Sequence, residues 1–396
     1  MLIKSIHPFP ARMAPELALS SLNELQPGST VLDPMSGSGT VLRQALALGH
    51  CAIGFDMDPL AVLMSRVWTT PTNDRAIASE LASVLEEAAD IDLRSTVLPW
   101  QQDEETARFV QFWFAPQQRR ELSRLAFVLE HRRLACRSAT RRAAIDVLRV
   151  AMSRIIITKE QCASLARDTS HSRPHRVALE SAYDVRLGFE RSAHLLRKRL
   201  IESPPASGAS VSFGDARALT LTDASVDAVL TSPPYLNAID YMRGHRMSLV
   251  WLGHSLTELR GIRSEAIGAE RGLHHHKRGE AADRIVSKMC TPSALSGRYP
   301  GMVKRYADDL IGMANQIARV LRPGGRATYV VGNSCVKGAF IRNADGVAEA
   351  AKLAGMVQVD VRERELPANS RYLPITLGGT LSKRMRTESV LTFRRI

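Results

Sequence analysis

Cysteine is scarce in this chain, and its placement excludes two classes of protein. The 396 residues include 5 cysteines, and no two of them have the C-x-x-C spacing of a zinc site. Thiols this few and this scattered do not form the disulfide framework of a small secreted domain either. We therefore expect a protein that folds around a hydrophobic core and holds no metal. The five positions are Cys51, Cys136, Cys162, Cys290 and Cys335.

Long apolar runs and a leader sequence are also missing. No apolar stretch is long enough to cross a bilayer, and prolines and charges interrupt the first residues, where a signal peptide would lie. These absences predict a cytoplasmic protein of bacterial or archaeal type, with no membrane partner.

Acidic residues are outnumbered by basic ones. The chain has 53 Lys+Arg against 40 Asp+Glu, which gives a formal net charge of +13. A polyanionic partner is the simplest explanation of this excess. A basic surface without a binding role would have the same composition, so the charge alone does not decide between the two.

Two consecutive prolines end a short apolar run in the second half of the chain. After the run 226–230 comes Thr231-Ser232-Pro233-Pro234-Tyr235. Because proline neither continues a helix nor donates a hydrogen bond to a sheet, we expect a buried strand that stops at a rigid, exposed turn. The turn carries a hydroxyl, carbonyl oxygens and an aromatic ring, which together could hold a planar base and accept hydrogen bonds from its exocyclic amine. A plain proline-terminated strand is the alternative.

A glycine-rich turn follows another apolar run near the N-terminus. The run 29–33 leads into Asp33-Pro34-Met35-Ser36-Gly37-Ser38-Gly39-Thr40 and then into good helix formers. Strand, glycine turn and helix open a nucleotide-binding α/β unit, because glycine lets the backbone approach a ligand closely. A second strand ends in Asp56, at roughly the 20-residue spacing from which an acid can bind ribose hydroxyls. A dinucleotide site is disfavoured, because Leu42 stands where the third glycine would be and Asp33 would repel a pyrophosphate.

Both motifs resemble those of one enzyme family. Asp-Pro-x-x-Gly-x-Gly-Thr is similar to motif I of the S-adenosylmethionine (SAM) methyltransferases. Ser-Pro-Pro-Tyr resembles motif IV of the DNA amino-methyltransferases, which methylate an exocyclic nitrogen of cytosine or adenine. The resemblance implies an α/β, Rossmann-like fold with a mixed seven-stranded sheet and a C-terminal antiparallel hairpin. It also implies SAM as the methyl donor, double-stranded DNA as the partner, and no metal.

Other segments resemble the same family and suggest a role for each site residue. His7-Pro8-Phe9-Pro10 is similar to motif X, and Gly214-Asp215 to motif III. The implied SAM-binding residues are Phe9 and Pro10, then Asp33, Pro34, Ser36, Gly37, Gly39 and Thr40, then Asp56 and Met57, and finally Asp215 and Ala216. The implied catalytic residues are Ser232, Pro233, Pro234 and Tyr235. The residues expected to contact DNA are Asn237, Tyr241, Arg243 and Arg173.

The first residue of the tetrapeptide bears on which base is methylated. Serine there resembles cytosine-N4 enzymes, whereas aspartate or asparagine is more usual in adenine-N6 enzymes. We therefore expect methylation of cytosine N4, in the manner of a restriction–modification enzyme for which a cognate endonuclease could be a genetic partner. Motif I precedes motif IV here, although many cytosine-N4 enzymes have the reverse order, so adenine-N6 methylation stays open.

Three other reactions or roles were weighed against this one. Cytosine-C5 methylation is excluded, because those enzymes use the thiolate of a Pro-Cys dipeptide and no cysteine here follows a proline. RNA guanine-N2 methylation and a non-catalytic DNA-binding role remain alternatives. The sequence leaves the oligomeric state open.

The motifs also predict how the chain is divided. We expect residues 1–70 and 210–396 to form the catalytic domain and residues 71–209 to form a mostly helical insertion. A basic stretch from Arg132 to Arg176 makes this insertion the candidate for DNA contact and target recognition, with a solvated helix face as the alternative. The polar segment 253–304 is expected to be a mobile basic loop.

Overall fold

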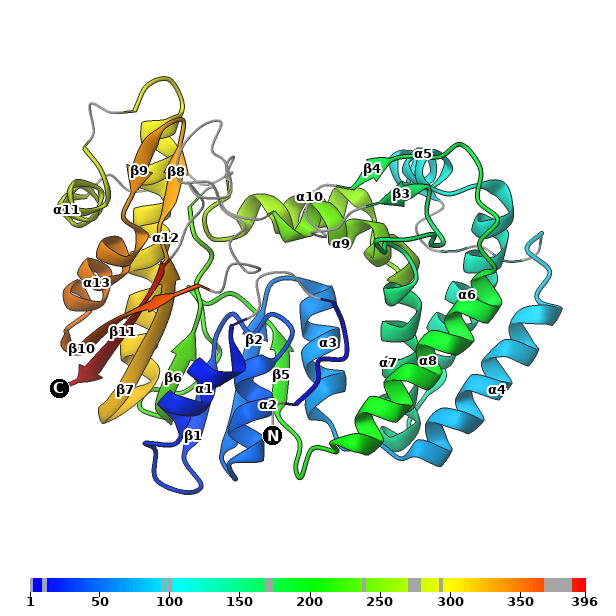
Figure 1. Ribbon diagram of the computed structural model, residues 1–396, viewed down its shortest axis with the longest axis horizontal. Helices are drawn as coiled ribbons and strands as arrows, with labels where there is room; N and C mark the ends of the chain where they lie inside the picture. Colours follow the sequence, from blue (N-terminus) through cyan, green and yellow to red (C-terminus); the bar gives the residue numbers. More distant parts are fainter. Residues whose placement is uncertain are drawn as a thin grey trace.

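The computed structural model describes most of the chain. The described residues are 3–8, 13–94, 96, 98, 102–167, 174–236, 240–269, 279–291, 295–366 and 387–396. In Figure 1 a sheet with flanking helices lies on the left, a group of helices lies on the right, and α9 and α10 lie between them.

A seven-stranded sheet forms the centre of the left-hand part, with the strand order β10-β11-β7-β6-β1-β2-β5. Strand β11 is antiparallel to both of its neighbours, and the remaining neighbouring pairs are parallel. This confirms the predicted mixed sheet with a C-terminal antiparallel hairpin. The strands are β1 Thr30–Asp33, β2 Cys51–Asp56, β5 Ser210–Phe213, β6 Val226–Thr231, β7 Leu321–Gly332, β10 Met356–Glu365 and β11 Thr387–Arg395.

Strand β1 is the point at which the order of the strands reverses. It pairs with β2 on one side and with β6, nearly two hundred residues later, on the other. In an open parallel sheet, ligands bind outside the carboxyl ends of the strands at such a switch point. The ends of β1 and β6 therefore mark the place to look for a site.

Helices cover both faces of the sheet, as buried parallel strands require. On one face α1 Pro15–Leu22 and α2 Thr40–Ala47 pack on Val31 and Leu230. On the other face Leu32 and Val229 pack against a second set of helices. This second set is α11 Glu280–Met289, α12 Tyr299–Val320 and α13 Asn343–Leu353. A small hairpin, β8 Ser334–Val336 with β9 Ala339–Ile341, follows β7.

The helices on the right of Figure 1, together with α9, η2 and α10, form what we call the helical unit. Helix α3 Pro59–Thr69, which follows β2, packs against this unit and shares its hydrophobic core. The other elements are α4 Asp74–Asp90, α5 Glu104–Trp113, α6 Pro116–Ala135, α7 Ala139–Arg154, the hairpin of β3 Ala166–Arg167 with β4 His175–Arg176, α8 Val185–Glu202, α9 Tyr241–Leu249, η2 Val250–Leu252 and α10 Leu256–Glu265.

The segment 253–304 differs from the single loop expected from the sequence. It contains α10 and α11, and α12 begins within it at Tyr299. Leu256 and Leu259 of α10 are buried in the core of the helical unit, and Ile285 and Met289 of α11 are buried under the sheet. The polar composition hid these apolar stripes, which recur every three or four residues on one face of each helix.

Candidate active site

The glycine turn joins β1 to α2 and is tied to β2 by a backbone hydrogen bond. Ser36 N–H donates to the Phe55 carbonyl oxygen at 2.8 Å. Gly37 and Gly39 have φ values of +51° and +88°, in the left-handed region that favours glycine. A Cβ on Gly39 would lie 2.9 Å from Ser65 Oγ and 3.0 Å from Ser65 Cα. Glycine is therefore needed here both for the backbone conformation and for the close approach of α3.

Asp33 ends β1 with a buried carboxyl group. Thr231 Oγ1 donates to it at 2.8 Å, and the Met35 N–H donates at 3.2 Å. Burial raises the pKa of Asp33 to about 7 and the charge of Asp56 adds to this rise, although the two hydrogen bonds oppose it. A nearby cation would favour the ionised form, so the site is suited to an ammonium group.

Asp56 ends β2 and lies beneath the glycine turn. Its two carboxylate oxygens accept hydrogen bonds from the N–H groups of Gly37 at 2.8 Å and Asp58 at 2.9 Å. Burial and the neighbouring charge of Asp58 raise the pKa of Asp56 to about 6. The Gly214 N–H donates to the Asp56 carbonyl at 3.0 Å, which brings the end of β5 to the same edge of the sheet.

A buried histidine connects this acid pair to α9. Asp58 caps α3 through the Leu60 N–H at 2.9 Å, and its other oxygen bonds His245 Nδ1. Burial alone would raise the pKa of Asp58, but the charge and hydrogen bond of His245 outweigh it and hold the pKa below its usual value. Tyr241 lies one turn earlier on α9, with its ring 6.3 Å from the His245 ring. Helix α9, which follows the Ser-Pro-Pro-Tyr segment in the chain, is thus fixed to the strand end that carries Asp56.

Asp215, expected at the adenine of SAM, forms a two-point ion pair with Arg217. Arg217 Nε lies 3.0 Å from both carboxylate oxygens, and Nη2 lies 2.7 Å from Oδ2. The same guanidinium also bonds Asp309 of α12. The carboxylate is therefore held in place by an arginine that the sequence analysis did not include in the site.

The Ser-Pro-Pro-Tyr turn directly follows β6. Ser232 Oγ donates to the Val330 carbonyl at 2.9 Å, so the lone pairs of this oxygen remain available to accept. Tyr306 Oη donates to the Pro234 carbonyl at 2.8 Å. Tyr235 is 9% exposed, and its hydroxyl donates to Glu388 of β11 at 3.2 Å. The turn is thus fixed by contacts from β7, α12 and β11, and these contacts leave it buried to half-buried instead of exposed as the sequence had indicated.

Hydrogen bonds bring most of the predicted residues to the carboxyl ends of β1, β2, β5 and β6. Thr231–Asp33 joins β6 to β1, and Gly37–Asp56 joins the glycine turn to β2. Arg243 lies on α9, 3.6 Å from Asp240. Pro34, Ser36, Thr40, Pro233 and Ala216 are buried, and Met57 is half-buried. Four predicted residues lie outside the described part of the chain: Phe9, Pro10, Arg173 and Asn237.

Sequence reasoning missed several groups that support the site. Tyr306 and Glu388 hold the Ser-Pro-Pro-Tyr turn, Thr231 at its start bonds Asp33, and Asp58 with His245 supports the strand end that carries Asp56. Asp58-Pro59 does carry a local signal, because an acid before a proline is a common start of a helix. The other partners lie in segments without a motif.

The N-terminal part of this site matches a known family. Residues 5–65 match a family model described as DNA methylase. Over these residues the chain matches the DNA amino-methyltransferases. The Type II methyltransferase M.MvaI of Kocuria varians is 34% identical over 82 residues, which are 20% of this chain and 18% of that protein. The chain therefore matches less than a fifth of the length of this curated relative.

Solved structures of SAM-dependent methyltransferases are similar at low identity. A TehB-like enzyme from Corynebacterium glutamicum is 10% identical, with 97% of this chain and 89% of that chain covered and a TM-score of 0.31. A methyltransferase from Methanosarcina mazei is 9% identical, with 97% and 98% covered and a TM-score of 0.33. Because both TM-scores are under 0.5, the fold is described by the strand order of the sheet and not by these similarities.

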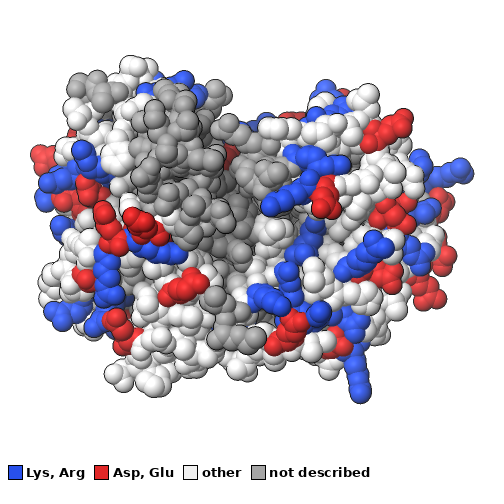
Figure 2. Space-filling model, in the orientation of Figure 1, with Lys and Arg blue, Asp and Glu red and all other residues white. Residues whose placement is uncertain are grey.

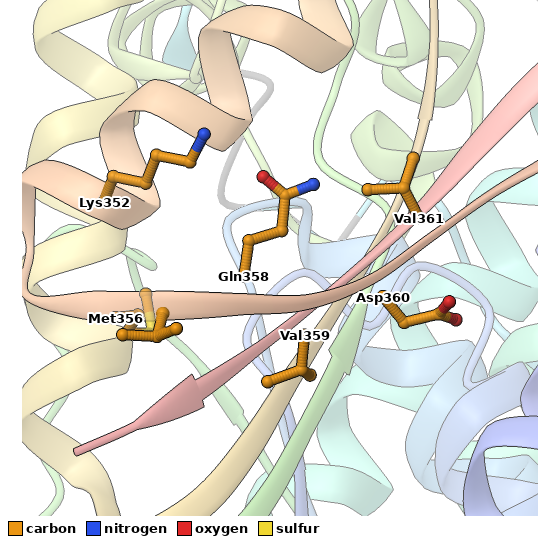
Figure 3. A pocket seen from close by; sticks show the side chains of 7 residues that line it. Lys352, Met356, Gln358, Val359, Asp360 and Val361 are labelled. Carbon is orange, nitrogen blue, oxygen red and sulfur yellow. The ribbon is translucent and has the colours of Figure 1, made fainter.

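Other features of the described residues lie apart from this site. A hollow of about 650 Å³ lies along the edge strand β10, lined by residues of β10 and by Lys352 of α13 (Figure 3). It includes none of the predicted site residues. Within the described ranges, no group of three His, Cys, Asp or Glu side chains could hold a metal ion, and no helix has the length and apolar character needed to cross a membrane.

Proposed function

We propose that this chain is a SAM-dependent DNA methyltransferase that transfers a methyl group to the N4 amine of cytosine in double-stranded DNA. The observation that carries the proposal is the bond between Thr231 and Asp33. It places a turn suited to a base amine directly beside a glycine turn suited to a nucleoside with a cationic tail.

The residues around the glycine turn fit SAM. The hydrogen bonds from Thr231 and Met35 to Asp33 come from neutral donors, so the ammonium of the methionine part would supply a charge partner to a carboxyl whose pKa burial has raised. Asp56 would accept hydrogen bonds from the ribose hydroxyls, and Asp215 from the adenine amine. When bound, SAM would supply a methyl group on a sulfonium centre and leave as a neutral thioether, and the methylated amine would lose one proton to Ser232 or to solvent.

The catalytic turn would act on the base amine. This amine is a poor nucleophile, because its lone pair is delocalised into the ring. Ser232 Oγ, whose proton points to Val330, and the Pro233 carbonyl would accept the two amine hydrogens and favour a pyramidal nitrogen. The base must first leave the duplex, at a cost of a few kcal/mol. Tyr235, fixed by Glu388, would stack on the extruded base and hold its nitrogen in line with the methyl group.

A nucleoside assay tests this function. The protein is incubated with unmethylated bacterial DNA and methyl-labelled SAM, and the digested DNA is analysed by mass spectrometry. We expect label in N4-methylcytosine, and we expect Tyr235→Ala to lose most of this activity while SAM affinity, measured by calorimetry, stays unchanged. Label in N6-methyladenine would keep the mechanism but overturn the base assignment. No label in DNA would overturn the proposal and direct the search to RNA.

A further inference from the structure

Several arginines of the basic stretch form ion pairs or hydrogen bonds with other residues of the helical unit or of the N-terminal segment. Arg132 pairs with Glu80 at 3.0 Å and with Glu87 at 2.7 Å. Arg133 pairs with Glu130 at 2.6 Å. Arginines held by acids of their own chain have little charge left for a phosphate. Arg141 also pairs with Glu80, and Arg154 donates to the Ile6 carbonyl.

The end of the basic stretch, at Arg176, presents arginine together with an exposed aromatic ring of α5. Phe112 of α5 is 49% exposed, and the guanidinium carbon of Arg176 on β4 lies 4.7 Å from its ring centroid. Trp113 meets the Phe112 ring edge-on at 5.0 Å. One turn earlier on α5, Phe109 lies 5.2 Å from the guanidinium carbon of Arg246 on α9. Burial and the charges of Arg263 and Arg243 lower the pKa of Arg246, whereas the charges of Asp240 and Glu105 oppose this shift.

Helix α10 connects this surface to the catalytic turn. At its N-terminus the Leu256 N–H donates to Thr106 Oγ1 of α5 at 2.8 Å, and further along Arg260 pairs with Glu105. At its other end Arg263 pairs with Asp240 at 2.6 Å, five residues after Tyr235. Figure 1 places α5, β3 and β4 beside α9 and α10, and Figure 2 shows Lys and Arg side chains with some Asp and Glu side chains among them on the right-hand part of the molecule.

We propose that this recognition face, defined by Phe112, Arg176 and Arg246, binds the DNA duplex beside the target base. Arginine contacts phosphates in a way that fixes the position of a protein on a duplex. An apolar ring such as that of Phe112 can contact base edges in a groove and so contribute to sequence preference. This inference rests on the proposed function, because it takes DNA as the substrate.

Phe112 and Arg176 are the best positions for a test, since both side chains are exposed and neither is part of the catalytic machinery. The full-length double variant Phe112→Ala/Arg176→Gln is compared with Leu134→Ala/Arg186→Gln. The control pair removes an exposed apolar side chain and an exposed arginine elsewhere on the helical unit. Binding of a fluorescein-labelled mixed-sequence duplex of about 30 base pairs is followed by anisotropy over a range of salt concentrations.

We expect the Phe112/Arg176 variant to bind the duplex about tenfold more weakly and its salt slope to be shallower by about one. SAM affinity and the control variant should be unchanged. If the wild-type protein methylates DNA and the Phe112/Arg176 variant binds like the control, the recognition face is wrong and the function stands. If the wild type binds the duplex through these residues but leaves it unmethylated, the face stands and the proposed function is wrong.

Discussion

At the scale of single residues, the ionised carboxyl group of Asp33 is expected to lower the stability of the free protein and to favour the binding of SAM. Burial raises the pKa of this carboxyl from 3.8 to about 7. Between these two pH values the folded protein holds a proton that the unfolded chain has lost, so the free energy of unfolding falls as pH rises through this window. Above pH 7 the free protein carries a buried charge that a cationic ligand would stabilise. SAM affinity should therefore weaken as pH falls below about 7, where the carboxyl becomes neutral.

Replacing Asp33 by asparagine should separate these two effects. In the absence of SAM, we expect Asp33→Asn to raise the free energy of unfolding by roughly 4 kcal/mol at pH 8 and by about 1 kcal/mol at pH 4.5, since each unit of pKa difference corresponds to about 1.4 kcal/mol. The same variant should bind SAM at least tenfold more weakly, because an amide does not pair with an ammonium. Urea unfolding at both pH values and calorimetry measure this, with the exposed Asp223→Asn as control. Lower stability at pH 8 than the control would contradict the argument.

At the scale of elements, the start of α2 depends on how closely α3 approaches it. Gly39 caps α2 with φ +88°, and Ser65 of α3 lies within 3 Å of where a Cβ would be. Ser65 also donates to the Gly37 carbonyl at 2.9 Å. Moving α3 would therefore disturb the turn that is proposed to hold SAM.

Two glycines allow this packing effect to be separated from backbone strain. Gly49 has φ +79°, but nothing lies within 4 Å of its Cβ position. We expect Gly49→Ala to cost about 1 kcal/mol, the strain of a left-handed residue, and to leave SAM affinity intact. Gly39→Ala should cost about 3 kcal/mol, because the contact with Ser65 adds to that strain, and should weaken SAM binding. If urea unfolding shows the same loss of stability for both variants, α3 moves away from the added methyl group without a measurable loss of free energy, and the packing argument is wrong.

The sequence indicated site residues where a polar side chain stands at the end of a strand, and it indicated few of them elsewhere. Strand ends such as Asp33 and Asp56 are recognisable because each polar group directly follows an apolar run. Contacts such as Tyr235 with Glu388, 153 residues apart, carry no local pattern and depend on which strands pair. The partner of Arg132, Glu80, comes 52 residues earlier on another helix, so the pair cannot be recognised from the basic run itself.

At the scale of the whole molecule, the helical unit shares its core with α3, the helix that follows strand β2 of the sheet. Leu63, Met64 and Trp68 of α3 are buried in the same cluster as Trp251 of η2 and the helices of the unit. Helix α3 therefore has one face that only the helical unit covers. The residues flanking the insertion are also close, since the Ala209 N–H donates to the Thr69 carbonyl at 3.3 Å.

Removing residues 71–209 should therefore prevent folding even though the gap is easily closed. A short Gly-Ser linker would span it, but the apolar side chains of α3 and η2 would face water, at about 1.5–3 kcal/mol each. That loss is on the order of 10 kcal/mol, comparable to the entire stability of a typical protein. We expect the shortened chain to be insoluble or to melt without a cooperative transition in circular dichroism. The full chain with the same linker inserted after Ala209 controls for the junction. A cooperative melt of the shortened chain would show that residues 1–70 and 210–396 fold independently of the insertion.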